Sequence, residues 1–215
     1  MISDNLDKFK SELPDDVTLV AVSKTKPVSE IMEAYNAGHR IFGENKVQEL
    51  EAKWQEMPKD IQWHMIGHVQ RNKVKYMAPF VSMIHAVDSP RLLKEINKQA
   101  KKNDRVIDCL LQIKIAAEDS KFGMDKADAE ALLASENVKN YENIKIIGLM
   151  GMATFTEDEK QVSEEFQKLK NIFDKFKAQH STFKILSMGM SGDYKIALKN
   201  GSNMVRVGSA IFGAR

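Results

Sequence analysis

The fold is indicated first by the stretch TLVAVSKTKP at residues 18–27, which changes character half-way along. Its first half, Thr18–Val22, is apolar or β-branched, and such a short run is typical of a buried strand. Its second half is polar and ends at Pro27, and a segment of helical period follows at Ser29–Ala37. A buried strand, a polar turn and a helix make up one unit of a parallel α/β sheet.

The same unit recurs along the whole chain of 215 residues. We expect strands at Thr18–Val22, Arg40–Phe42, Gln62–Ile66, Met83–Ala86, Val106–Ile113, Lys145–Leu149, Lys184–Leu186 and Asn203–Arg206. We expect helices at Leu6–Leu13, Ser29–Ala37, Lys46–Gln55, Asn72–Met77, Pro90–Lys101, Lys126–Glu136, Glu157–Ala178 and Asp193–Lys199. Eight strands with intervening helices predict a (β/α)8 TIM barrel with an extra N-terminal helix, and a doubly wound open sheet is the alternative. No linker-like segment divides the chain, so we expect one domain over residues 1–215.

Two helices carry clear local signals. Ser89-Pro90 places a capping hydroxyl before a proline, whose missing N–H is tolerated at the first helical position. In the segment 157–178, apolar residues recur at spacings of three and four, which predicts one stripe packed against the sheet.

Composition and charge exclude several classes of protein. Thirty-two Lys and Arg residues against 30 Asp and Glu leave a net charge of +2, which gives no electrostatic footprint for nucleic acid. No run approaches the roughly 18 apolar residues of a membrane span, and Met1–Lys8 does not resemble a signal peptide. The single cysteine, Cys109, lies in an apolar run, which favours a buried and inert thiol. We therefore expect a soluble cytoplasmic protein.

In a barrel, function belongs at the carboxyl ends of the strands, and Lys24 follows the first strand there. An amine at this place can lose its charge by desolvation and become a nucleophile toward carbonyls. The alternative is a surface lysine with a solvated head group.

Two glycine-containing segments at the same end suggest a phosphate site. SMGMSG at residues 187–192 follows the seventh strand and VGSA at residues 207–210 follows the eighth. Backbone N–H groups in such loops, together with the hydroxyls of Ser187, Ser191 and Ser209, could bind phosphate beside Gly208. The alternative is that the glycines only mark turns.

Three further side chains stand near strand ends. Arg206 would need a partner if buried, either a ligand or a neighbouring carboxylate. His64 and His85 could line a pocket, whereas His68 is interpreted as a loop or surface residue. No Cys or His spacing typical of a metal site occurs, so we expect no metal.

Several motifs together carry a resemblance to one family. They are AVSKTKP at 21–27, FGEN at 42–45, WHMIG at 63–67, LSMGMS at 186–191 and MVRVGSAIFG at 204–213. With them the sequence resembles the YggS/PROSC family, the pyridoxal phosphate homeostasis proteins, from about residue 17 to Arg215. The chain departs from the usual pattern at Lys46, Val69 and Ser209, which affects details of the site's rim.

The resemblance implies a barrel like the N-terminal domain of alanine racemase, with pyridoxal 5'-phosphate bound as a Schiff base on Lys24. It implies that Asn45 and His64 line the cofactor and that Arg206 faces the pyridine nitrogen. The residues implied to hold the phosphate are Ser187, Ser191, Gly208 and Ser209.

The same resemblance bears on activity. An arginine offers only donors, so it bonds an unprotonated pyridine nitrogen and leaves the ring a weaker electron sink. Racemisation remains possible but needs a second acid or base, which alanine racemases take from a tyrosine in a separate domain. Because the eighth predicted strand lies so close to Arg215, we expect no such domain here, and none of the four tyrosines is an obvious substitute.

We therefore expect a cofactor-binding protein of pyridoxal phosphate homeostasis, with no catalytic residues and no robust turnover. It is expected to be a monomer that could pass the cofactor to apo-enzymes. A minor amino-acid racemase is the first alternative. A cofactor-free Schiff-base barrel of the aldolase type is the second.

Overall fold

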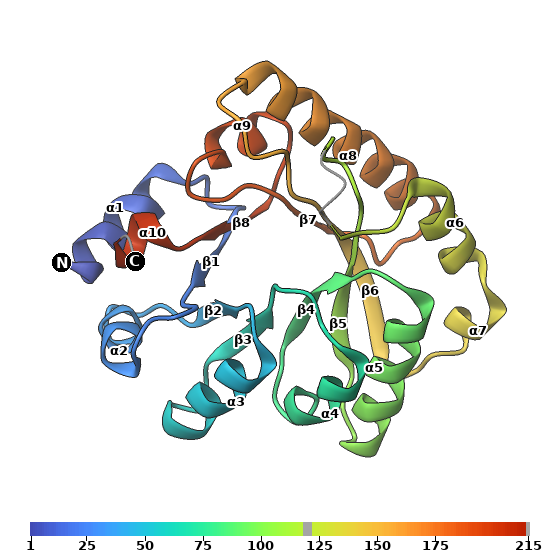
Figure 1. Ribbon diagram of the computed structural model, residues 1–215, viewed down its shortest axis with the longest axis horizontal. Coiled ribbons are helices and arrows are strands. Elements are labelled where there is room, and N and C mark those ends of the chain that lie inside the picture. The colour runs from blue at the N-terminus through green and yellow to red at the C-terminus, as the bar shows by residue number, and fades with distance from the viewer. Residues whose placement is uncertain (118–121, 214–215) are drawn as a thin grey trace.

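The computed structural model describes residues 1–117 and 122–213, which form a closed barrel of parallel strands with helices around the outside (Figure 1). Neighbours in sequence are neighbours in the sheet, and the barrel closes where Thr18–Ala21 pairs with Met204–Val207. The strands are β1 Thr18–Val22, β2 Ile41–Glu44, β3 Gln62–Met65, β4 Met83–Val87, β5 Ile107–Gln112, β6 Ile144–Met150, β7 Ile185–Ser187 and β8 Met204–Val207. This confirms the predicted barrel, and each strand end lies at most two residues from its expected place.

The helices also follow the predicted order, with differences at short segments. They are α1 Ile2–Glu12, α2 Val28–Asn36, α3 Val47–Glu56, η1 Arg71–Lys73, α4 Val74–Met77, α5 Pro90–Lys102, α6 Lys126–Ala134, α7 Glu136–Lys139, α8 Glu159–Gln179, α9 Tyr194–Lys199 and α10 Ser209–Phe212. The predicted helix at 126–136 is two helices, because the backbone is extended at Ser135. The last helix, α10, was not expected, since one turn of helix has too short a pattern to detect.

The strands sort their side chains into two separate cores. In β1, Val20 belongs to a small apolar cluster inside the barrel, whereas Ala21 packs in the larger layer between the barrel and its helices. In β8, Met204 lies inside and Val205 outside in the same way. This alternation is the period of two that a strand imposes on its side chains.

The helix signals predicted from the sequence are present. Ser89 Oγ accepts a hydrogen bond of 3.3 Å from the Leu92 N–H at the start of α5. The apolar stripe of α8 is buried at Val162, Phe166, Leu169, Ile172, Phe173 and Phe176. Cys109 is fully buried, as expected, and burial raises the pKa of its thiol.

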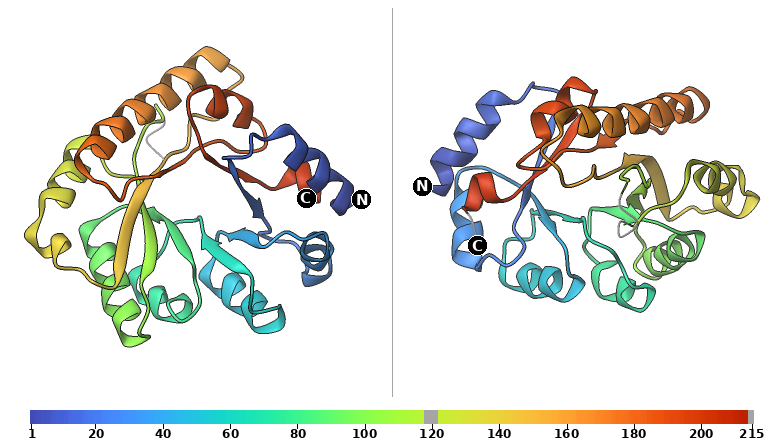
Figure 2. Two further views of the ribbon diagram at one scale, coloured as in Figure 1. Left: turned by 180° about the vertical axis from the view of Figure 1, so that it is seen from behind. Right: turned by 45° about the horizontal axis from the view of Figure 1, so that its top comes forward.

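The two ends of the described chain lie side by side. Helices α1 and α10 are adjacent in both views of the molecule (Figure 2), and the Asn5 side-chain amide donates a hydrogen bond of 3.1 Å to the Ile211 carbonyl. The Tyr194 hydroxyl donates to Glu12 at 2.8 Å. These contacts cover the seam between the first and last strands. Within the described ranges, no helix has the length and apolar character needed to cross a bilayer.

The core analysis gives a test of stability. Leu93 on α5 is fully buried in the outer layer, so Leu93→Ala should lower the free energy of unfolding by about 3 kcal/mol, because it removes buried methyl groups and leaves a cavity. Urea denaturation followed by circular dichroism measures this change. Val106→Ala is the control, since Val106 is 47% exposed and should change stability by less than about 0.5 kcal/mol. Equal effects of the two substitutions would contradict the assigned core.

Candidate functional site

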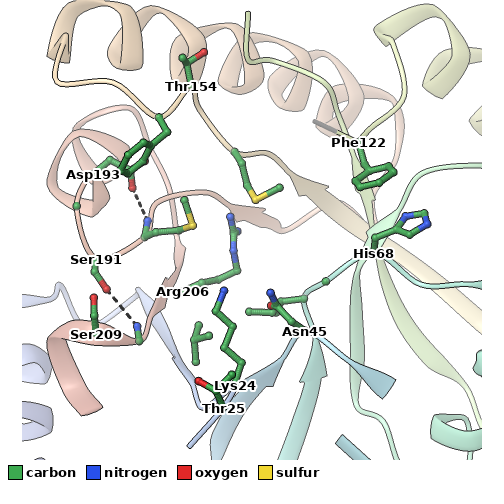
Figure 3. Close-up of a pocket in the computed structure, with 18 of the residues that line it drawn as sticks. Lys24, Thr25, Asn45, His68, Phe122, Thr154, Ser191, Asp193, Arg206 and Ser209 are labelled. Carbon is green, nitrogen blue, oxygen red and sulfur yellow. Dashed lines mark hydrogen bonds between the residues drawn. The ribbon is translucent and has the colours of Figure 1, made fainter. Parts of the chain in front are cut away.

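A cavity of about 650 Å³ opens at the carboxyl ends of the strands (Figure 3). Its walls come from the ends of β1, β2, β3, β5, β6, β7 and β8 and from the segments that follow them. Of the residues predicted for a ligand site, six line the cavity: Lys24, Asn45, Ser191, Arg206, Gly208 and Ser209. The barrel therefore brings together residues that lie far apart in sequence.

Lys24 enters the cavity because the alternation of β1 continues beyond its end. Val20 and Val22 are buried on the inner side, and Lys24 lies two residues further on. Its side chain is half-buried and points into the cavity toward Arg206 (Figure 3). This is the position that a lysine nucleophile requires.

Asn45 is held close to Lys24 by the approach of two loops. A side chain at Gly67 would place its Cβ 2.4 Å from the Asn45 carbonyl oxygen, so only glycine fits there. The Asn45 side chain lies beside the end of Lys24 in the cavity (Figure 3). Gly67, which follows β3, therefore allows the close approach that places Asn45, which follows β2.

Arg206 forms part of the cavity floor and is almost completely buried. Its guanidinium donates to the Ser187 carbonyl at 2.9 Å, to Ser187 Oγ at 2.6 Å and to the Gly151 carbonyl at 3.1 Å. Among the described residues these acceptors are neutral, and no carboxylate forms a salt bridge with Arg206. Burial lowers the pKa of Arg206 to about 10, so the group stays charged at neutral pH.

A buried chain of hydrogen bonds continues from Arg206 across the barrel interior. Ser187 Oγ lies 3.1 Å from His85 Nδ1, and His85 Nε2 lies 3.0 Å from His64 Nδ1. Arginine can only donate, so Ser187 Oγ accepts from it, and the Ser187 hydroxyl hydrogen is available to His85 Nδ1. The positive charge of Arg206 favours this direction, in which the hydroxyl hydrogen points away from the guanidinium. In this arrangement His85 carries its proton on Nε2 and donates to His64 Nδ1.

His64 and Ser187 therefore occupy a different place from the one expected. Both are buried beneath the cavity, and neither lines it. Burial lowers the pKa of His64 to about 3 and holds the pKa of His85 well below its usual range, so both rings are neutral. They support the floor of the cavity through Arg206.

The loops after β7 and β8 form one side of the cavity. Gly189 has φ +98°, and a Cβ there would lie 2.7 Å from Ala197 Cβ, so the turn requires glycine. Ser191 Oγ accepts from the Gly208 N–H at 3.3 Å, which holds the two loops together. Ser209 lies next to them (Figure 3). Hydroxyl and backbone donors thus gather on this side.

His68 is an exposed loop residue, as predicted, and it also lines the cavity. Its Nδ1 lies 2.9 Å from Asp88 Oδ2, and its ring stacks on Phe122 with centroids 4.2 Å apart. The signal that could have found it is its place directly after Gly67, in a loop at the functional end of the barrel. Within residues 1–117 and 122–213, no group of three or more His, Cys, Asp or Glu side chains could hold a metal ion.

Comparison with known proteins identifies the family. The family model described as alanine racemase, N-terminal domain, matches residues 1–215. A pyridoxal phosphate homeostasis protein of Vibrio alginolyticus is 39% identical over 207 residues, which cover 94% of this chain and 88% of that protein. The chain belongs to the family that this model describes, which includes the pyridoxal phosphate homeostasis proteins. The protein of the same name from Escherichia coli K12 is 37% identical, over 94% of this chain and 87% of its own length.

Solved structures agree with the fold. PipY of Synechococcus elongatus PCC7942, solved with PLP bound, has a TM-score of 0.90 and 34% identity, covering 99% of this chain and 100% of PipY. Alanine racemase from Bartonella henselae has a TM-score of 0.77 at 18% identity, with 58% of that chain covered, which is a likeness of fold. The resemblance predicted from the motifs is thus confirmed.

The neutral histidines predict a pH dependence of stability. His64 stays unprotonated in the folded protein down to pH about 3, whereas in the unfolded chain it binds a proton below about 6.5. Stability should therefore be lost as the pH falls through this window. His64→Gln should reduce the slope of the unfolding free energy against pH by up to about 1.4 kcal/mol per pH unit. Urea denaturation at a series of pH values measures the slope.

The control for this experiment is His180→Gln, at the end of α8 outside the barrel, which should keep the wild-type slope. Glutamine at position 64 keeps an acceptor for His85, so the buried chain is preserved in the test variant. An unchanged slope in His64→Gln would contradict a neutral His64 in the folded protein.

Proposed function

We propose that this protein binds pyridoxal 5'-phosphate as a Schiff base on Lys24 and serves its homeostasis without robust turnover. The observation that carries the proposal is the shared cavity: a lysine amine, a buried guanidinium and a donor-rich pair of loops line it together. The names of the relatives and the PLP in the PipY structure support the same ligand.

The residues of the cavity fit the chemical groups of this cofactor. The aldehyde needs a lysine amine, which Lys24 supplies. The phosphate needs donors, which the hydroxyls of Ser191 and Ser209 supply beside Gly208, whose own N–H donates to Ser191 Oγ. Arg206 offers donors without a paired carboxylate and would bond the pyridine nitrogen, while Asn45 lines the ring. When bound, the cofactor supplies a reactive aldehyde and an electron-accepting ring.

Ser187 and His64 take a supporting part in this proposal. Ser187 accepts from Arg206 and passes the hydrogen-bonded chain on to His85, and His64 ends the described chain. Their effect on the cofactor is exerted through the orientation of the guanidinium. We therefore propose them as positioning residues rather than as contacts of the phosphate or ring.

The limited turnover follows from Arg206. A group that is charged and can only donate keeps the pyridine nitrogen unprotonated, and an unprotonated ring stabilises a carbanion poorly. Reactions that depend on a strong electron sink, such as transamination and β-elimination, are disfavoured at such a site. Storage of the aldehyde needs no electron sink.

Lys24→Ala tests the proposed function. The wild-type protein with pyridoxal phosphate should show the visible absorbance of a Schiff base, and borohydride should bleach it and leave a phosphopyridoxyl mass on the peptide that contains Lys24. Lys24→Ala should lose both signals because the attacking amine is gone. Absorbance spectra and peptide mass mapping make the measurement.

The matched control is Lys98→Ala, an exposed lysine of α5, which should behave as the wild type. Trapping of the cofactor at another lysine in Lys24→Ala would overturn the proposal. A colourless protein that borohydride traps only with a sugar phosphate would instead support a cofactor-free barrel of the aldolase type.

A minor amino-acid racemase is the second candidate, and one observation favours it. His68 lines the cavity and is oriented by Asp88, an arrangement suited to an acid or base. Against it, none of the described residues that line the cavity is a tyrosine. We therefore propose that racemisation is at most a side activity.

Chiral chromatography of alanine distinguishes the two candidates. The holoprotein incubated with L-alanine should form no D-alanine beyond that formed by free pyridoxal phosphate, because the ring is a weak electron sink. Sustained interconversion that is lost in both Lys24→Ala and His68→Gln would contradict this expectation and establish the racemase. His180→Gln is the histidine control.

The proposal includes the wider setting of the protein. We propose a monomeric, single-domain cytoplasmic protein over residues 1–215 that holds the cofactor and releases it to apo-enzymes. The even balance of charge, 32 basic against 30 acidic residues, supports a protein without a nucleic-acid partner.

A further inference from the structure

A cluster of charged side chains forms hydrogen bonds with the residues on both sides of Lys24, Ser23 and Thr25. Ser23 Oγ donates to Glu44 Oε1 at 2.6 Å, and the Ser23 carbonyl accepts from Lys53 Nζ at 2.7 Å. On the other side, the Thr25 N–H donates to Glu49 Oε1 at 2.5 Å. Three hydrogen bonds from β2 and α3 thus fix the residues before and after the cavity lysine.

Lys53 is the centre of this cluster. Besides the Ser23 carbonyl, its ammonium donates to Glu44 at 2.8 Å and to Glu49 at 2.7 Å, so all three N–H donors are used. Lys53 is 7% exposed and Glu44 is fully buried. Burying such charges is expensive, and a buried ion pair is weak evidence for net stabilisation. Net stabilisation of the fold therefore does not explain why these charges are buried here.

The backbone that the cluster holds is unusual. Thr25 has φ +64°, in the left-handed region that a β-branched residue rarely adopts. Such a conformation persists only where the surroundings enforce it, and it occurs most often at functional sites. The bond from Thr25 to Glu49 supplies that constraint.

We propose that Glu44, Lys53 and Glu49 form a clamp whose role is to position Lys24 for attack on an aldehyde. The inference rests on the proposed function and deepens it. The clamp lies on the outer side of the barrel wall, where Ser23 points, whereas Lys24 points into the cavity. Its residues reach the reaction only through the backbone, so they are positioning residues.

The reaction that the clamp serves depends on orientation. The Lys24 nitrogen forms a bond to the aldehyde carbon, and the carbonyl oxygen leaves as water with the two hydrogens of the neutral amine. A small displacement of an attacking group can lower the rate of such a step strongly. Binding of the phosphate uses the opposite loops and does not require the lysine. Loss of the clamp should therefore weaken the Schiff base and leave phosphate-anchored binding intact.

Two ligands separate these effects: pyridoxal phosphate, and 4'-deoxypyridoxine 5'-phosphate, which has a methyl group in place of the aldehyde. Glu49→Ala should weaken pyridoxal phosphate binding about tenfold to about 100-fold, the range for loss of a charge-assisted hydrogen bond, and slow imine formation. Binding of the aldehyde-free analogue should stay unchanged. Glu49→Gln keeps an acceptor for the Thr25 N–H and should restore most of the lost affinity.

Lys53→Met is the second variant, and Glu56→Ala at the exposed end of α3 is the control that should match the wild type. Glu49 is only partly buried, so Glu49→Ala decides the question even if Lys53→Met does not fold. Equal weakening of both ligands, or of neither, would overturn the clamp while leaving Lys24 as the cofactor lysine. A wild-type protein that forms no Schiff base on Lys24 would overturn the proposed function, and the clamp with it.

Discussion

Each strand of the barrel directs neighbouring side chains to opposite faces, and this alternation decides what every residue of the site can contact. Ser23 and Lys24 are joined by one peptide bond, yet Ser23 reaches Glu44 outside the barrel wall and Lys24 reaches the cavity. The same alternation sends Arg206 inward between Val205 and Val207 of the outer layer. A shift of one residue in any strand would exchange these two environments.

On the inner face of the barrel, Arg206 determines the charge and orients the hydrogen bonds. Its charge is buried and forms no salt bridge with a carboxylate among the described residues, and its neutral acceptors stabilise the charge without cancelling it. A charge held in this way favours a ligand atom with a lone pair and rejects a protonated one. It also favours one direction of hydrogen bonding through Ser187, His85 and His64, and burial keeps both rings neutral.

The sequence predicts the parts of this structure that local patterns decide. The strands and the helix at Pro90–Lys102 follow from β-branched runs, caps and apolar periodicity, which depend on neighbours in the chain. The depth of a side chain along the barrel axis depends on register and closure, so the place of Ser187 below the cavity could not be predicted. The same holds for Lys53, which meets a residue 30 positions away in sequence.

Two lysines near the end of β1 show why residue type alone does not define function. Lys53 is surrounded by Ser23, Glu44 and Glu49, and because all three of its N–H groups donate to them, no direction remains for a carbonyl to approach. Lys24 faces a cavity that is also lined by the guanidinium of Arg206 and by Ser191 and Ser209. The ammonium of Lys53 has a structural role, and the proposed clamp to which it belongs sets the direction of the Lys24 side chain.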